Sequence, residues 1–86
     1  MLKTDMFGHL RFYVRGERAD LERFTINLAW YHSALAEIGS MVDHGDGIVT
    51  LNLIVREEDN EDQLRALADR FHVIGFASFD ELKKDD

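Results

Sequence analysis

The sequence predicts one α+β domain in which two helices cover one face of a four-stranded antiparallel sheet. Three observations support this fold class: an alternating apolar pattern at 9–15, two segments with apolar residues every three or four positions, and a Gly-Asp-Gly turn between extended segments. Alternation of period two is typical of a half-buried strand, whereas spacings of three and four are typical of one helix face. The predicted order of elements is therefore strand, helix, strand, strand, helix, strand.

The first strand and the first helix follow directly from these patterns. Residues 9–15 (HLRFYVR) alternate apolar and polar side chains, and Gly16 ends the strand. The predicted helix begins at Arg18, and Gly39 is expected to end it, because glycine often follows the last turn of a helix. The apolar face of this helix consists of Leu21, Phe24, Leu28, Tyr31, Leu35 and Ile38.

A β-hairpin is predicted after the first helix. Residues 40–43 and 48–56 are its expected strands, and the HGDG sequence lies between them. Glycine in such a turn supplies the positive φ that tight hairpin turns require. In the second strand, Val49, Leu51, Leu53 and Val55 share one face.

The second helix and the chain ends complete the prediction. The helix has an apolar face made of Leu64, Leu67, Ala68 and Phe71. Asp59 or Asn60 is the expected N-cap, because both side chains can accept a hydrogen bond from the first turn. A short last strand is expected at 76–79 (FASF), an N-terminal arm at 1–8 and a polar tail at 81–86.

This order of elements is that of the ferredoxin-like fold, βαββαβ, whose strands lie in the order 4-1-3-2. The alternative is a three-stranded α+β domain in which the last strand does not form. Residues 1–86 contain no proline and no Gly/Ser linker, so a single domain is expected.

The charge distribution restricts the classes of partner. The net charge is −7, with five basic and five acidic residues in 1–42 but five basic and twelve acidic residues in 43–86. An acidic chain gains nothing from counterion release on nucleic acid, and anionic membranes are disfavoured for the same reason. A partner protein with a basic surface is expected instead. The absence of cysteine favours the cytoplasm, because small secreted domains usually depend on disulfides.

Two features of the predicted fold indicate where such a partner binds. The topology brings nine carboxylates to one pole, namely Glu57, Glu58, Asp59, Glu61, Asp62, Asp80, Glu81, Asp85 and Asp86. Capping needs only one or two acids, and like charges this dense repel one another, so the excess predicts contact with a basic surface.

Ile26 and Trp30 are the second feature. At about 100° per residue they lie on the side of the first helix opposite its apolar face. Tryptophan is among the commonest residues that dominate binding energy at interfaces, so both residues are predicted to contact a partner. The alternatives are that the arm or the tail covers Trp30, or that this face forms a homodimer.

No motif predicts a catalytic residue, a metal or a cofactor. His9, His32, His44 and His72 fall on different elements, which excludes the usual spacing of zinc ligands. Asp43, His44 and Asp46 could approach a metal together, but Asp and Gly are also what the hairpin turn requires for its backbone.

The open face of the sheet is a second candidate site, made of Arg11, Tyr13, Arg15, Arg18 and Asn52. Arg15 and Arg18 with Asn52 resemble the arginine and asparagine of acylphosphatases, although the glycine-rich phosphate loop is missing. Tyr13 resembles an aromatic position of RNA-recognition domains, but the other central strand offers no aromatic partner. Gly16 lies where ACT-type regulatory domains, often dimeric, bind amino acids.

The sequence therefore predicts a small non-enzymatic protein-interaction module, an inhibitor that docks on a basic surface of a nucleic-acid-processing protein. In size and charge the chain resembles phage anti-restriction and anti-CRISPR inhibitors, and this resemblance covers composition rather than any motif. The alternative is an ACT-like dimeric domain that binds a small molecule.

Overall fold

The structure is a computed structural model that describes residues 2–84. Its elements are β1 (Leu10–Glu17), α1 (Arg18–Tyr31), β2 (Ala36–Asp43), β3 (Ile48–Val55), the 3-10 helix η1 (Glu58–Asn60), α2 (Glu61–Arg70), β4 (Ile74–Phe76) and α3 (Phe79–Lys84). The strands form one antiparallel sheet in the order β2-β3-β1-β4, which is the predicted order counted from the other edge. The predicted α+β class is confirmed.

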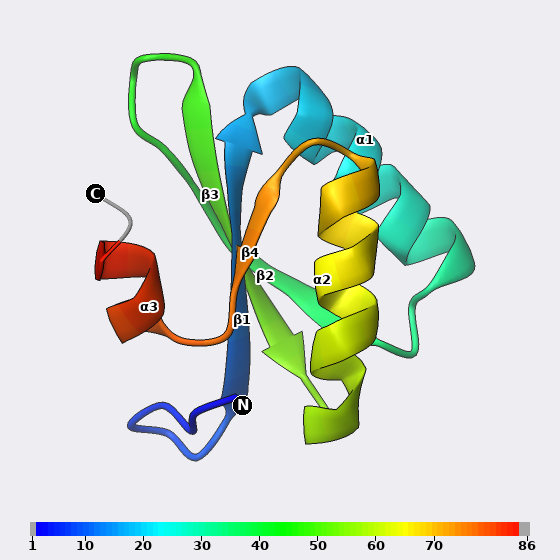
Figure 1. Ribbon diagram of the computed structural model, residues 1–86, viewed down its shortest axis with the longest axis vertical. Helices are drawn as coiled ribbons and strands as arrows, with labels where there is room; N and C mark the ends of the chain where they lie inside the picture. The colour runs from blue at the N-terminus through cyan, green and yellow to red at the C-terminus, as the bar shows by residue number, and fades with distance from the viewer. Residues whose placement is uncertain (1, 85–86) are drawn as a thin grey trace.

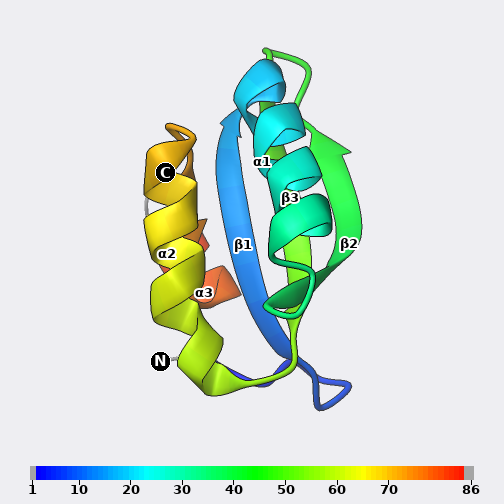
Figure 2. The same cartoon turned by 90° about the vertical axis from the view of Figure 1, so that its right-hand side faces the viewer.

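The sheet is covered on both faces. Helices α1 and α2 lie on one face, and α3 lies on the other (Figures 1 and 2). The side chains of β1 alternate between these layers. Phe12 and Val14 are buried on the α1–α2 face, whereas Tyr13 meets Phe79 of α3 edge to face, with the ring centroids 5.8 Å apart. The main core therefore lies on the α1–α2 face, and Tyr13 and Phe79 form a smaller apolar contact on the other face.

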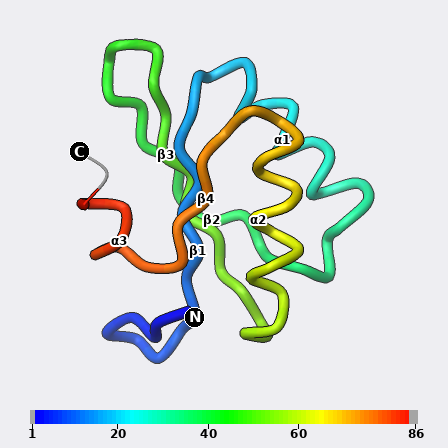
Figure 3. Tube along the Cα trace, in the orientation of Figure 1, coloured from blue at the N-terminus to red at the C-terminus, as the bar shows by residue number. Residues whose placement is uncertain are grey.

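The main core lies between the sheet and the pair α1 and α2. Phe24 of α1 and Phe71 after α2 meet edge to face, with their ring centroids 6.2 Å apart, and this contact joins the two helices. The core also contains the predicted residues Leu21, Leu28, Val49, Leu51, Leu53, Val55, Leu64 and Leu67, together with Leu2 and Val73, which were not predicted. Figure 3 shows the path of the chain between the layers.

The first helix is shorter than predicted. It ends at Tyr31, so the prediction that it continues to Gly39 is wrong. At about 1.5 Å per residue α1 is about 21 Å long, close to the roughly 26 Å of an eight-residue strand. A helix continuing to Ile38 would overrun the sheet and leave too short a strand to pair with β3. Ile38 instead pairs with Leu53.

Strand β2 is correspondingly longer than the predicted 40–43. Its pairing with β3 is irregular between Ile38 and Met41, where Gly39 lies. A Cβ atom on Gly39 would come within 2.7 Å of the backbone oxygen of Asn52. Glycine is therefore needed here because two strands approach closely at a bulge, and it does not end a helix.

The predicted last strand forms, but at 74–76 instead of 76–79, and the predicted polar tail is helical as far as Lys84, while 85–86 lie outside the described residues. β4 ends at Phe76, and a helix begins at Phe79. The Ser78 hydroxyl accepts a hydrogen bond from the Glu81 N–H, while the Glu81 carboxylate accepts one from the Ala77 N–H, both at 3.2 Å. This Ser-x-x-Glu pattern is close to a capping box. Leu82 is buried, which holds the helix on the sheet.

The N-terminal arm is ordered against β1. Thr4 pairs with Leu10, and Leu2 is buried. Asp5 accepts a hydrogen bond from Arg11 Nε at 2.6 Å and further bonds from the N–H groups of Phe7 and His9. The bond from Arg11 and the backbone bonds hold the pKa of Asp5 at about 2, below its usual 3.8.

The end of α2 forms a Schellman motif. The Val73 N–H donates to the Ala68 oxygen at 3.1 Å, and the His72 N–H donates to the Asp69 oxygen at 3.2 Å. His72 has a φ of 62°, a left-handed conformation that glycine adopts more easily than any other residue.

We expect His72→Gly to raise the free energy of unfolding by about 1 kcal/mol, because glycine removes the clash of Cβ in the left-handed conformation. Chemical denaturation of the two proteins measures this change. His72→Ala is the control, since alanine keeps Cβ and should bring no such gain. A destabilised glycine variant would contradict the account of this helix end.

Asp5 should also give the free energy of unfolding a defined pH dependence. Because its pKa is lower in the folded chain, its stabilising effect is present above about pH 4 and is lost as the pH falls towards 2. Asp5→Asn removes the charge, so the stability difference between the two proteins should shrink over this range. Denaturation curves between about pH 5 and pH 2 measure it. A difference that does not vary with pH would contradict the role of the Arg11 bond.

Candidate protein-interaction surface

The outer side of α1 carries two exposed apolar side chains. Leu21, Phe24 and Leu28 face the sheet, which leaves Ile26 and Trp30 on the opposite side of the helix. Ile26 is 59% exposed and Trp30 is 78% exposed. Neither the described part of the arm nor α3 covers Trp30, so that alternative does not hold for residues 2–84.

Tyr31 is a third exposed residue at this end of α1, and the sequence prediction placed it in the core. It is the last residue of the helix and is 75% exposed. The helical spacing that predicted a core position for Tyr31 continues in the sequence beyond the point where the helix ends. Two adjacent aromatic side chains are therefore open to solvent.

The acidic segment 57–62 lies at the same end of the molecule. The Asn60 side-chain N–H donates to the Leu35 oxygen at 3.1 Å, which ties η1 to the connection between α1 and β2. Asn60 occupies the predicted N-cap position of α2, but its side chain makes no capping bond there. Figure 2 shows α1 running down the fold, so that it ends above the level at which α2 begins.

Four carboxylates of this end face solvent. Glu57, Glu58, Asp59 and Asp62 are exposed and make no ion pair within residues 2–84. We refer to these four residues as the acidic patch.

The other predicted members of the pole have different surroundings. Arg65 Nε donates to Glu61 at 3.0 Å, and Arg65 Nη2 donates to Glu81 at 3.0 Å. Burial alone would lower the pKa of Arg65, but its bonds to these two carboxylates raise it. Asp80 lies 3.5 Å from Lys3 Nζ, and Asp85 and Asp86 lie outside the described residues.

In the second candidate site, Tyr13 and Asn52 are paired across β1 and β3, and each of the five residues has its own surroundings. Arg11 binds Asp5, Tyr13 packs on Phe79, and Arg18 pairs with Asp43. The Asn52 Oδ1 atom is buried without a hydrogen-bond partner in the described part of the chain. Arg15 lies with its guanidinium carbon 5.7 Å from the centroid of the Phe76 ring. α3 separates the Tyr13 end of the sheet face from solvent.

The turn from β1 to α1 offers no cradle for a ligand. β1 ends at Glu17 and α1 begins at Arg18, so no loop separates them. The Arg18 N–H donates to the Gly47 oxygen at 3.1 Å and is occupied. A Cβ atom on Gly16 would lie 2.6 Å from Val73 Cγ1, so this glycine serves packing. Gly16 and the Arg18 N–H therefore each have a structural role here.

The hairpin turn is held by its own aspartates. Asp43 accepts a hydrogen bond from the Gly45 N–H at 2.9 Å, and Asp46 accepts one from the Ile48 N–H at 3.0 Å. The Gly45 bond and the Arg18 guanidinium lower the pKa of Asp43. Within residues 2–84 there is no group of three metal-binding side chains, and no helix is long and apolar enough to cross a membrane.

The exposure of Trp30 can be measured directly, because it is the only tryptophan of the chain. We expect its fluorescence spectrum in the free protein to resemble that of an indole in water. We also expect acrylamide to quench it almost as strongly as it quenches free tryptophan. A blue-shifted spectrum with weak quenching in the monomer would show that Trp30 is covered and would remove it from the candidate surface.

No protein-family model matches the chain, and no curated protein or solved structure matches it either. The inference about function therefore rests on the surface described above.

Proposed function

We propose that the protein is a small non-enzymatic interaction module, built on a ferredoxin-like βαββαβ scaffold, that docks on a basic surface of a partner protein. The observation that carries this proposal is the bond between Asn60 and Leu35. It ties η1, which carries part of the acidic patch, to the connection that follows α1. We propose that the apolar side chains of α1 and the acidic patch contact the same partner.

The two parts of this surface have different physical roles. Trp30 and its neighbour Ile26 supply apolar area that is exposed in the free protein and becomes buried on binding. A buried tryptophan at an interface contributes about 2 kcal/mol or more. The carboxylates of the acidic patch act at longer range, because they attract a basic surface before contact and raise the association rate.

The charge of the acidic patch also indicates the class of partner. Proteins that process nucleic acids present basic surfaces to phosphate groups, and an exposed cluster of carboxylates can occupy such a surface. We propose that the module acts as an inhibitor in this way, as anti-restriction and anti-CRISPR proteins do. A cytoplasmic partner is consistent with a chain that contains no cysteine.

The proposal predicts separate kinetic effects for the two parts. Glu57→Gln with Glu58→Gln should lower the association rate by about three- to tenfold at low salt and flatten its salt dependence. Trp30→Ala should mainly raise the dissociation rate, by roughly thirtyfold for a loss of about 2 kcal/mol. The partner is captured from the host lysate on the unmodified protein, and the rates are measured by surface plasmon resonance.

A matched control separates local from overall charge. Glu17→Gln with Asp69→Asn also removes two negative charges, but away from the acidic patch, because Glu17 precedes the start of α1 and Asp69 lies near the end of α2. This double variant should leave the association rate almost unchanged. Equal effects of the two double variants would contradict a role for the acidic patch. A dimer that dissociates on Trp30→Ala, measured by light scattering, would show that the aromatic end binds a second copy of the chain instead.

A further inference from the structure

We propose that the protein binds an arginine-rich segment of its partner rather than a basic surface of any composition. This inference rests on the proposed function and names the chemistry of the partner. The observation that carries it is the pair of exposed aromatic side chains at the end of α1, Trp30 and Tyr31. Within residues 2–84 neither ring contacts another ring or a cation, whereas every other aromatic ring except that of Phe7 does so. The aromatic pair is therefore open to a cation from outside.

The segments that carry the aromatic pair and the acidic patch are linked by short hydrogen bonds. One residue after Tyr31, the His32 oxygen accepts a bond from the Leu35 N–H at 2.9 Å. The Leu35 oxygen in turn accepts the bond from Asn60 Nδ2 at 3.1 Å. Because the backbone of one residue spans less than about 4 Å, the His32 oxygen and Asn60 Nδ2 lie at most about 10 Å apart. An extended peptide covers about 3.3 Å per residue, so a partner segment of a few residues can reach both features.

Arginine suits this combination better than lysine does. Its planar guanidinium stacks on an indole or phenol ring, and its N–H groups donate in pairs to a carboxylate. Lysine carries a strongly hydrated point charge, so it is attracted by the carboxylates but gains less from the rings. The acidic patch therefore selects a basic segment, while Trp30 and Tyr31 select arginine within that segment.

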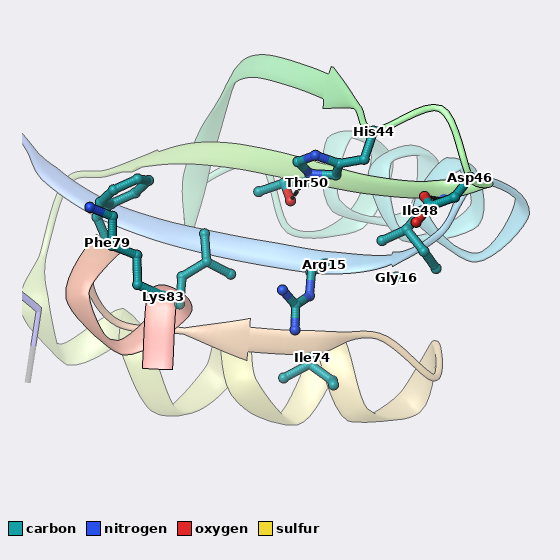
Figure 4. Close-up of a pocket in the computed structure, with 10 residues that line it drawn as sticks. Arg15, Gly16, His44, Asp46, Ile48, Thr50, Ile74, Phe79 and Lys83 are labelled. Carbon is teal, nitrogen blue, oxygen red and sulfur yellow. Dashed lines mark hydrogen bonds between the residues drawn. The ribbon is translucent and has the colours of Figure 1, made fainter. Parts of the chain in front are cut away.

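The distribution of charge directs such a segment to this end of the molecule. A second copy of the chain would bring another net charge of −7, so repulsion disfavours it as the occupant. The hollow between the β2–β3 hairpin, β4 and α3 is lined by Arg15 and Lys83 together with Asp46 (Figure 4). Two cations beside one carboxylate disfavour a basic segment there, whereas the acidic patch attracts it.

This chemistry also gives the proposed inhibitor a mechanism. Arginine is the residue that proteins use most for paired hydrogen bonds to phosphate groups. A module that stacks on these arginines and pairs with them competes with nucleic acid for the same side chains. Inhibition of the partner should therefore be competitive with nucleic acid.

The test is a titration of the full chain with two capped peptides of equal charge, hexa-arginine and hexa-lysine. Trp30 is the only tryptophan, so its fluorescence reports contact with the peptide. We expect hexa-arginine to change this fluorescence and to bind at least about fivefold more tightly than hexa-lysine. Equal binding of the two peptides would overturn the inference but leave docking on a basic surface in place. If neither peptide binds, the proposed function fails together with the inference.

Three variants, measured by calorimetry, separate stacking from charge. Trp30→Leu keeps an apolar side chain but removes the ring, and should weaken hexa-arginine binding by about fivefold while leaving hexa-lysine binding nearly unchanged. Phe7→Leu is the matched control, because it removes a ring that is 74% exposed in the N-terminal arm, and it should have little effect. Glu57→Gln with Glu58→Gln should weaken both peptides alike. Equal losses from Trp30→Leu and Phe7→Leu, or an equal loss of both peptides on Trp30→Leu, would overturn the inference.

Discussion

The rest of the structure depends on the contacts of Arg65, because this one side chain joins four elements. Its guanidinium binds Glu61 at the start of α2, the Gly75 oxygen of β4 and Glu81 of α3, and it lies over the Phe12 ring of β1. A planar group with five donors can hold several partners in fixed directions, which lysine cannot do. These contacts fix the position of α3 on the sheet. Two carboxylates near the acidic patch, those of Glu61 and Glu81, are also paired with this guanidinium.

Local patterns predicted the parts of the fold in which local chemistry decides the conformation. The alternation around Phe12, the glycines of the hairpin turn and the spacing of Leu64 and Leu67 all gave correct elements. The end of α1 could not be predicted in the same way, since Leu35 and Ile38 keep helical spacing although the length of the sheet ends the helix. The start of α3 could have been predicted from Ser78 and Glu81, whose spacing is that of a capping box. The segment is so polar, however, that it has no apolar pattern typical of a helix.

The residues of the candidate surfaces were likewise predicted correctly where a local pattern decides their position and wrongly where the tertiary fold decides it. Ile26 and Trp30 were predicted correctly as outward-facing, because helix periodicity alone decides on which side of α1 they lie. Tyr31 was misplaced together with the end of the helix. The hollow between the β2–β3 hairpin, β4 and α3 could not be predicted from the sequence, because it forms only when Phe79 and Lys83 fold back over the sheet beside Arg15. Sites made by one element can be found in a sequence, whereas sites made between distant elements require the tertiary fold.

The bulge at Gly39 has a consequence for solubility. β2 is an edge strand of eight residues, its outer edge pairs with no strand in the described chain, and Ile38, Met41 and Val42 are partly exposed along it. Long, flat, apolar edges invite strands of other molecules to add to the sheet and begin aggregation. The irregularity at Gly39 bends this edge in the middle and breaks the regular row of donors and acceptors that an added strand would need. The residue that permits close contact between two strands thus also protects the folded monomer from uncontrolled sheet growth.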